Sequence, residues 1–78
     1  MTHVPNELAE EFPNLEDRIH ELKIHDNHFR RLFDDYHTVN RKIHHAEAAK
    51  VNISDEHITE MRKKRLLLKD ELFAMLTS

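Results

Sequence analysis

The chain has 78 residues, no cysteine, no glycine and only two prolines, both before residue 14. This composition excludes disulfides and thiolate zinc sites, and without glycine few routes remain to tight hairpin turns, so we expect no β-rich fold. The net charge is −3, and 35% of the residues are charged, which is typical of long helices. Chains below ~80 residues rarely build a core worth more than ~3–5 kcal/mol, so oligomerisation often supplements the core.

The charge is distributed unevenly along the chain. The first 21 residues carry six acidic side chains and one basic side chain, whereas the rest carry nine acidic and eleven basic ones. The acidic start has neither the basic nor the apolar region of a signal peptide. No apolar run approaches the ~20 residues that a membrane helix needs. We therefore expect a cytoplasmic protein with no membrane contact.

Residues 1–13 are expected to form an acidic arm with a short helix. Pro13 ends this helix, because the residue before a proline disfavours helical backbone. Beyond it, an apolar pattern predicts one long helix over about residues 14–50, with steps of four and three once Asp26 and Asn40 are counted as positions in the series. The pattern consists of Leu15, Ile19, Leu22, Phe29, Phe33, Tyr36 and Ile43.

The long helix is followed by a turn predicted at about residues 51–54. Ser54 suits the N-cap position of the next helix. Ile53 and Ile58 have the spacing of a hydrophobic staple around that cap. A second apolar stripe then predicts a helix over about residues 55–76.

A short connection between two amphipathic helices makes them antiparallel neighbours. The predicted fold is all-α: an antiparallel, coiled-coil-like helical hairpin over residues 14–78, preceded by the short helical arm over residues 1–13. The first helix is longer than the second, so the apolar row at its start lacks a partner. Either the arm folds back over this row or another chain covers it, and we expect a homo-oligomer. The predicted interaction surface is Leu8, Phe12, Leu15, Ile19, Leu22 and Phe29.

Three polar residues occupy positions that the apolar stripes assign to the core: Asp26, Asn40 and Arg65. A polar residue at such a position can set the register and the oligomeric state at a cost in stability. Pairing the helices at equal distances from the turn places Arg65 near Tyr36 and Asn40, where it can hydrogen-bond and stack. The pattern therefore predicts a register-setting polar core.

Two stretches of the sequence resemble the YdcH-type family of small bacterial proteins. They are LKIHDNHFRRLFDDYHTVNRKIHHAE over residues 22–47 and MRKKRLLLKDELFAML over residues 61–76. NELAEEFP over residues 6–13 is similar to the opening of longer members. The resemblance implies a helical hairpin in the bacterial cytoplasm. It implies no activity, because the family has no settled function and no catalytic residues to carry over. Asn40 departs from the family pattern, in which an acid is expected at least as often.

Eight histidines are many for a chain of this size. Glu21, His25 and His28 follow one helix face, but zinc needs three or four converging ligands, and the HExxH motif is absent. We therefore expect exposed polar histidines and no native metal site. A pH-sensitive role is the alternative, because histidine titrates near neutrality.

The sequence carries no recognisable catalytic motif. It has no glycine-rich phosphate loop and no cysteine nucleophile. Asp34 and Asp35 are adjacent, so on a helix they point ~100° apart. A two-helix hairpin also offers no concave apolar pocket of the usual size. We therefore expect no enzyme, no cofactor and no small-molecule substrate.

The basic run over residues 62–65 can contact phosphates. Glu60 is spaced to pair with Lys64 on the same helix, which favours the interpretation that the run is only a solvent-exposed helix face.

The predicted function is therefore protein–protein contact and self-association, with a protein partner that the sequence does not identify. The alternative is a nucleic-acid-associated small regulator. It would use Arg62, Lys63, Lys64 and Arg65.

Overall fold

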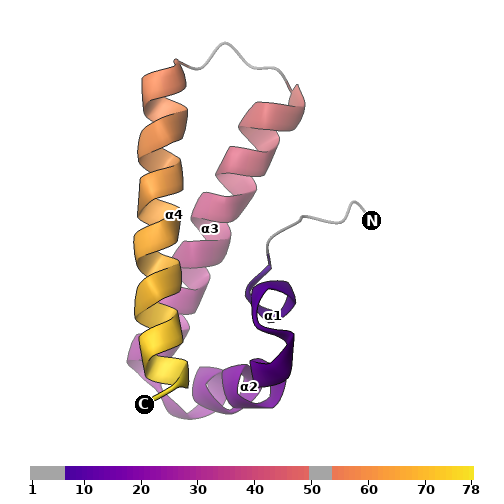
Figure 1. Cartoon of the computed structure of the whole chain (residues 1–78), viewed down its shortest axis with the longest axis vertical. Helices are drawn as coiled ribbons and strands as arrows, with labels where there is room; N and C mark the ends of the chain where they lie inside the picture. Colours follow the sequence, from indigo (N-terminus) through magenta and orange to yellow (C-terminus); the bar gives the residue numbers. More distant parts are fainter. Residues whose placement is uncertain (1–6, 50–53) are drawn as a thin grey trace.

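The computed structural model describes residues 7–49 and 54–78. All elements in these two ranges are helices, which confirms that the fold is all-α. In chain order they are α1 (Leu8–Glu11), the short 3-10 helix η1 (Pro13–Leu15), α2 (Glu16–His25), α3 (Asn27–Ala49) and α4 (Asp55–Leu76). Figure 1 shows α3 and α4 side by side, with α2 crossing one end of the pair next to the C-terminus.

The start of α4 agrees with the sequence prediction. Ser54 is the N-cap, and its Oγ accepts a hydrogen bond from the backbone N–H of His57 over 3.2 Å. This bond satisfies one of the N–H groups that a helix start leaves free. Ile53 of the predicted staple lies outside the described residues, as does the predicted turn before Ser54.

The helix predicted over residues 14–50 is wrong as a single element, because it is interrupted at Asp26. This residue has extended backbone, with φ −129° and ψ 108°, between α2 and α3. Its Oδ1 accepts a hydrogen bond from the backbone N–H of Phe29 over 3.0 Å, and its own N–H donates to the carbonyl of Leu22 over 2.9 Å. Asp26 thus ends α2 and caps α3. A short carboxylate side chain competes for backbone N–H groups in this way.

The break at Asp26 turns α2 out of the axis of α3 (Figure 1). The apolar residues at the start of the chain therefore fold back over the α3–α4 pair and share its core. The division into an arm over residues 1–13 and a unit over residues 14–78 stays a prediction. The buried members of the core are Leu8, Ile19, Phe29, Tyr36, Val39, Ile43, Leu68, Leu72 and Leu76.

Polar contacts between α3 and α4 show that the two helices run in opposite directions. Arg62, early in α4, donates from Nη2 to Oε1 of Glu47, late in α3, over 2.7 Å. Arg65, one turn further along α4, donates to Asn40, which lies earlier in α3. Contacts that move forward on one helix and backward on the other define an antiparallel pair.

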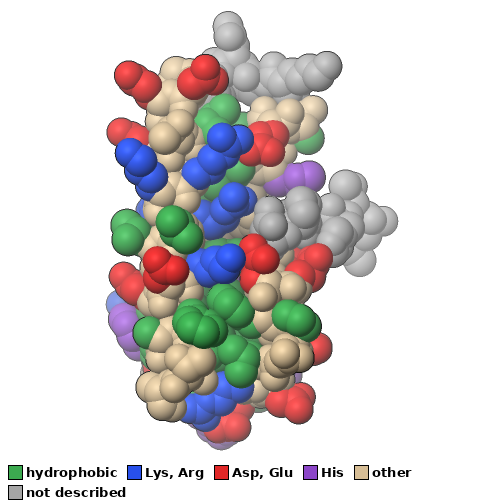
Figure 2. Space-filling view, in the orientation of Figure 1, with side chains coloured by type: hydrophobic (Ala, Val, Ile, Leu, Met, Phe, Trp, Pro, Cys, Tyr) green, Lys and Arg blue, Asp and Glu red, His purple; other side chains and the backbone are tan. Residues whose placement is uncertain are grey.

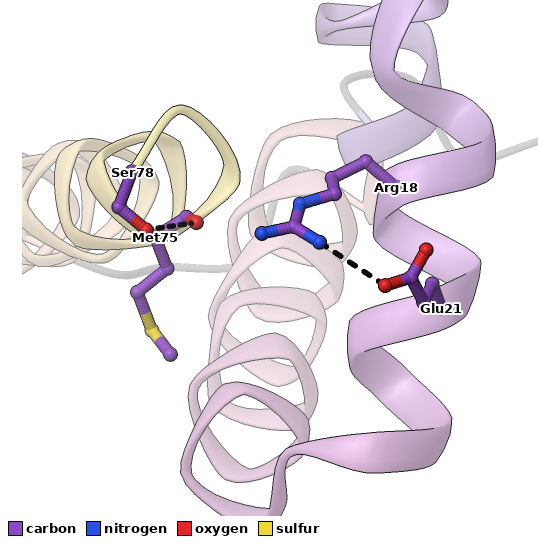
Figure 3. Close-up of polar contacts among 4 residues, drawn as sticks. All are labelled: Arg18, Glu21, Met75 and Ser78. Carbon is purple, nitrogen blue, oxygen red and sulfur yellow. Dashed lines mark hydrogen bonds and ion pairs between the residues drawn. The ribbon is translucent and has the colours of Figure 1, made fainter.

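Figure 3 shows the end of the molecule where α2 approaches the C-terminus of α4. The hydroxyl of Ser78 donates to the carbonyl of Met75 over 2.9 Å, which satisfies a backbone group at the helix end. On α2, Arg18 Nη1 and Glu21 Oε1 form an ion pair of 3.1 Å. Both side chains of this pair are well exposed to solvent, so it adds little stability.

Candidate functional site

The residues predicted as an exposed interaction surface lie against the core. Three of them are at most 4% exposed: Leu8, Ile19 and Phe29. The other three are partly buried against the same core: Phe12, Leu15 and Leu22. The sequence left open whether the arm or another chain covers this row, and the structure has the arm folded over it. The prediction that these residues form an exposed surface is therefore corrected. They are covered because the break at Asp26 allows α2 and α1 to turn back.

An aromatic and a charged contact hold the end of α1 on α4. The rings of Phe12 and Phe73 stack with their centroids 5.0 Å apart. The Nζ of Lys69 lies 5.6 Å from the ring centroid of Phe12 and 3.4 Å from Oε1 of Glu11. Each side chain of this ion pair is only about 30% exposed, so solvent screens it less than a pair in open water.

The predicted register-setting polar core divides into two parts. Asn40 is 1% exposed, and its Oδ1 accepts a hydrogen bond from Nη1 of Arg65 over 2.9 Å. Next to them, Tyr36 is fully buried. The pKa of its hydroxyl is raised to about 12, mainly by desolvation and to a smaller extent by the negative charge of Glu11. Asp26 instead caps the start of α3. A register-setting role for Arg65 and Asn40 stays a prediction.

His37 is a buried titratable residue that sequence reasoning missed. It is 5% exposed; its Nδ1 lies 2.7 Å from Oε2 of Glu7, and its Nε2 has no hydrogen-bond partner among the described residues. The ring of Phe33 packs against it at 4.3 Å between centroids. Desolvation lowers the pKa of His37, and the carboxylate of Glu7 opposes this effect. Phe33, His37 and Asn40 are spaced by four and then three residues, and this helical spacing indicates that His37 lies on a buried face.

A cleft of about 300 Å³ lies beside His37, lined by residues of α1, α2 and α3 and by Glu7. The sequence predicted no such pocket, because it forms only when the arm folds back. Its lining carries carboxylates, imidazoles and one ammonium group, but no hydroxyl or thiol. The Nζ of Lys23 lies 4.5 Å from the ring centroid of Phe33, a cation–π contact. Within residues 7–49 and 54–78, no three histidine, aspartate or glutamate side chains are placed to hold a metal ion.

The basic run over residues 62–65 is divided between two sides of α4. Arg62 and Arg65 reach across to α3, where they bind a carboxylate and an amide. Lys63 and Lys64 are exposed and form no ion pair with any residue that the structure describes. The four side chains therefore do not form one continuous basic surface.

The exposed side of α4 combines apolar and charged residues. Leu66 and Leu67 are 57% and 64% exposed, although they are adjacent and large. In Figure 2, hydrophobic side chains on α4 lie between basic ones nearer its start and acidic ones nearer its end. Apolar residues with a charged rim are typical of contact surfaces. We call this surface the α4 outer face. Its residues are Lys63, Lys64, Leu66, Leu67, Asp70 and Glu71.

The fold and these sites define a small all-α protein with one shared core. Of its described helices, none is long and apolar enough to cross a lipid bilayer. Residues 29–76 match the sequence model of a family described as protein of unknown function DUF465, which covers more than half of the chain. The chain therefore belongs to this family. No curated protein and no solved structure matches this chain.

Proposed function

We propose that this chain is a non-enzymatic helical-hairpin protein that acts through protein–protein contact and self-association. The observation that carries the proposal is the exposure of Leu66 and Leu67 on the α4 outer face. Most other apolar residues of α4 face the core, whereas these two leucines expose more than half of their surface and contribute little to the packing of their own chain. Burial of both against another protein would remove apolar area from water, which favours association.

The size of the chain supports the same proposal. A core built from 78 residues is small, and oligomerisation is a common way to add buried area. Among the residues that the structure describes, two other large apolar side chains are exposed, but they are placed differently. Phe73 already stacks on Phe12 of the arm, and Ile24 is a single exposed residue on α2. The α4 outer face is therefore the favoured contact surface.

The lack of a hydroxyl or thiol among the groups that line the cleft supports a non-enzymatic role. Its lining offers no hydroxyl or thiol nucleophile, and burial disfavours ionisation of the nearby Tyr36 hydroxyl. The resemblance to the YdcH-type family supports a bacterial cytoplasmic location, which we propose together with this role.

Nucleic-acid binding is the weaker candidate. Two of the four basic side chains in the run over residues 62–65 are engaged with α3. The two exposed lysines are followed on the same side of α4 by Asp70 and Glu71, which reduce the local positive potential. We expect the protein to flow through an RNA or DNA column at low salt, whereas salt-dependent retention would favour the nucleic-acid role.

Light scattering of single-site variants tests the proposed function. We expect the wild type to show a mass above that of a monomer and Leu67→Asp to show the monomer mass, because a buried carboxylate opposes association. Ile24→Asp is the matched control, since Ile24 is 63% exposed on α2 and Leu67 is 64% exposed on α4. A wild-type chain that is monomeric at all concentrations would contradict self-association.

A further inference from the structure

The charges on the α4 outer face are arranged symmetrically about Leu67. Lys63 and Lys64 lie one turn before the leucines, and Asp70 and Glu71 lie one turn after them. All four charged side chains are exposed, and none forms an ion pair with a residue that the structure describes. The chain therefore leaves two positive and two negative charges unpaired on one side of a single helix.

Helix geometry places these charges on the side of α4 that faces away from the rest of the chain. At 100° per residue, all four lie within about 60° of the direction of Leu67. Arg62, Arg65 and Lys69 point the other way, and they are the side chains that contact α3 and α1. The unpaired charges and the exposed leucines are thus accessible together.

We propose that two copies of this chain pair through their α4 outer faces, antiparallel, about a two-fold axis at Leu67. Such an axis brings together residues that lie equally far from it on opposite sides. Lys63, four residues before Leu67, then lies within one residue along the helix of Asp70 of the second copy, which is three residues after it, and both are on the same side of the contact line. Lys64 of one copy and Glu71 of the second copy are related in the same way on the other side. The symmetry repeats each contact, so every unpaired charge on this face gains an opposite partner.

The charge order also determines the direction of the pairing. In a parallel pair in the same register, Lys63 would face Lys63 and Asp70 would face Asp70, and like charges repel. In the antiparallel pair the same side chains attract, while Leu67 meets its copy at the centre and Leu66, about 100° further round the helix, is covered at the edge. Exposed ion pairs contribute little affinity but select orientation, so burial of the leucines provides the driving force.

This inference rests on the proposed self-association and adds its partner, its direction and its register. Charge reversal tests it with three variants of the full chain. The first carries Lys63→Glu and Lys64→Glu, the second carries Asp70→Lys and Glu71→Lys, and the third carries all four changes. The third variant has the net charge of the wild type, so it is a control for charge as well as for substitution.

Sedimentation equilibrium should give a dimer for the wild type and the third variant, and a monomer for the first and second variants. An equimolar mixture of the first two should recover the dimer, because one face is then wholly acidic and the other wholly basic. Circular dichroism checks that each variant keeps its helices. If the first two variants dimerise like the wild type while Leu67→Asp does not, the register is wrong but self-association stands. A monomeric wild type overturns both.

Discussion

The carboxylate of Asp26 accepts a hydrogen bond from the backbone N–H of Phe29, and this contact marks the point where one expected helix becomes two. The cap stabilises the bend through which α2 and α1 cover the core instead of extending beyond it. We expect Asp26→Ala to lower the free energy of unfolding by about 1 kcal/mol, the usual cost of losing an N-cap. Urea unfolding measures the change.

Asp34→Ala is a suitable control for the cap, because Asp34 is exposed and pairs only weakly with Arg30 over 3.4 Å. Its effect should stay below about 0.5 kcal/mol, as for other exposed pairs on a helix. Equal losses for Asp26→Ala and Asp34→Ala would show that the cap does not stabilise the bend.

The hydrogen bond between Arg65 and Asn40 predicts a cost for removing only one partner. Asn40 is buried, and Arg65→Met removes the charged donor that hydrogen-bonds to its Oδ1. We expect a loss of about 1–3 kcal/mol in the free energy of unfolding. Adding Asn40→Leu to Arg65→Met should recover part of the loss, because it removes the buried polar group. A melting temperature that rises in Arg65→Met while the oligomeric state stays unchanged would contradict a register-setting role.

Burial of His37 predicts that acid destabilises the fold. Because desolvation lowers the pKa of His37, the unfolded chain takes up a proton at a higher pH than the folded chain. The free energy of unfolding should therefore be greatest near neutral pH and fall as the pH drops below about 6.5, the ordinary histidine value. Glu7, which lies 2.7 Å from the imidazole, reduces the size of the effect.

Thermal melts across this pH range test the assignment by comparing the wild type with His37→Phe. The variant should lose less stability than the wild type between neutral and acidic pH. The same pH dependence in both proteins would mean that another group causes it.

The stack of Phe12 on Phe73 predicts that the arm can be loosened without unfolding the α3–α4 pair. Phe12→Ala removes an aromatic pair worth about 0.5–1.5 kcal/mol and the cation–π contact with Lys69. Amide hydrogens of α1 should then exchange faster, while those in the middle of α4 keep their protection. Phe12→Leu keeps an apolar contact and should have a smaller effect. If hydrogen exchange in α1 did not change, a contact other than the Phe12–Phe73 stack would hold α1 in place.

The parts of the fold that depend on local signals were predictable from the sequence. Ser54 and the apolar stripe after it define α4, because a cap and a periodic face act within a few residues of chain. Asp26 was ambiguous, since an acid at a core position of a heptad series can be either a buried polar residue or a helix cap. The choice depends on whether the preceding segment packs better when it turns back, which is a tertiary effect.

The candidate site was less predictable than the helices. On a straight helix the row that includes Leu15 and Ile19 has no partner, whereas the break at Asp26 lets it pack against the core. His37 seemed one of many polar histidines, although its spacing from Phe33 placed it on a buried face. The cleft beside it needs α1 and α3 together, so no local pattern contains it.

Disulfide cross-linking tests the antiparallel pairing through α4 most directly, because the chain has no cysteine of its own. Residue 67 lies at the proposed axis, so Leu67→Cys should link to its copy under oxidising conditions. At 1.5 Å per residue, the two copies of residue 74 lie about 20 Å apart, too far for a disulfide. Ala74→Cys should therefore stay unlinked alone and link when mixed with Glu60→Cys. Ready linking of Ala74→Cys to itself, with no link through residue 67, would contradict the account.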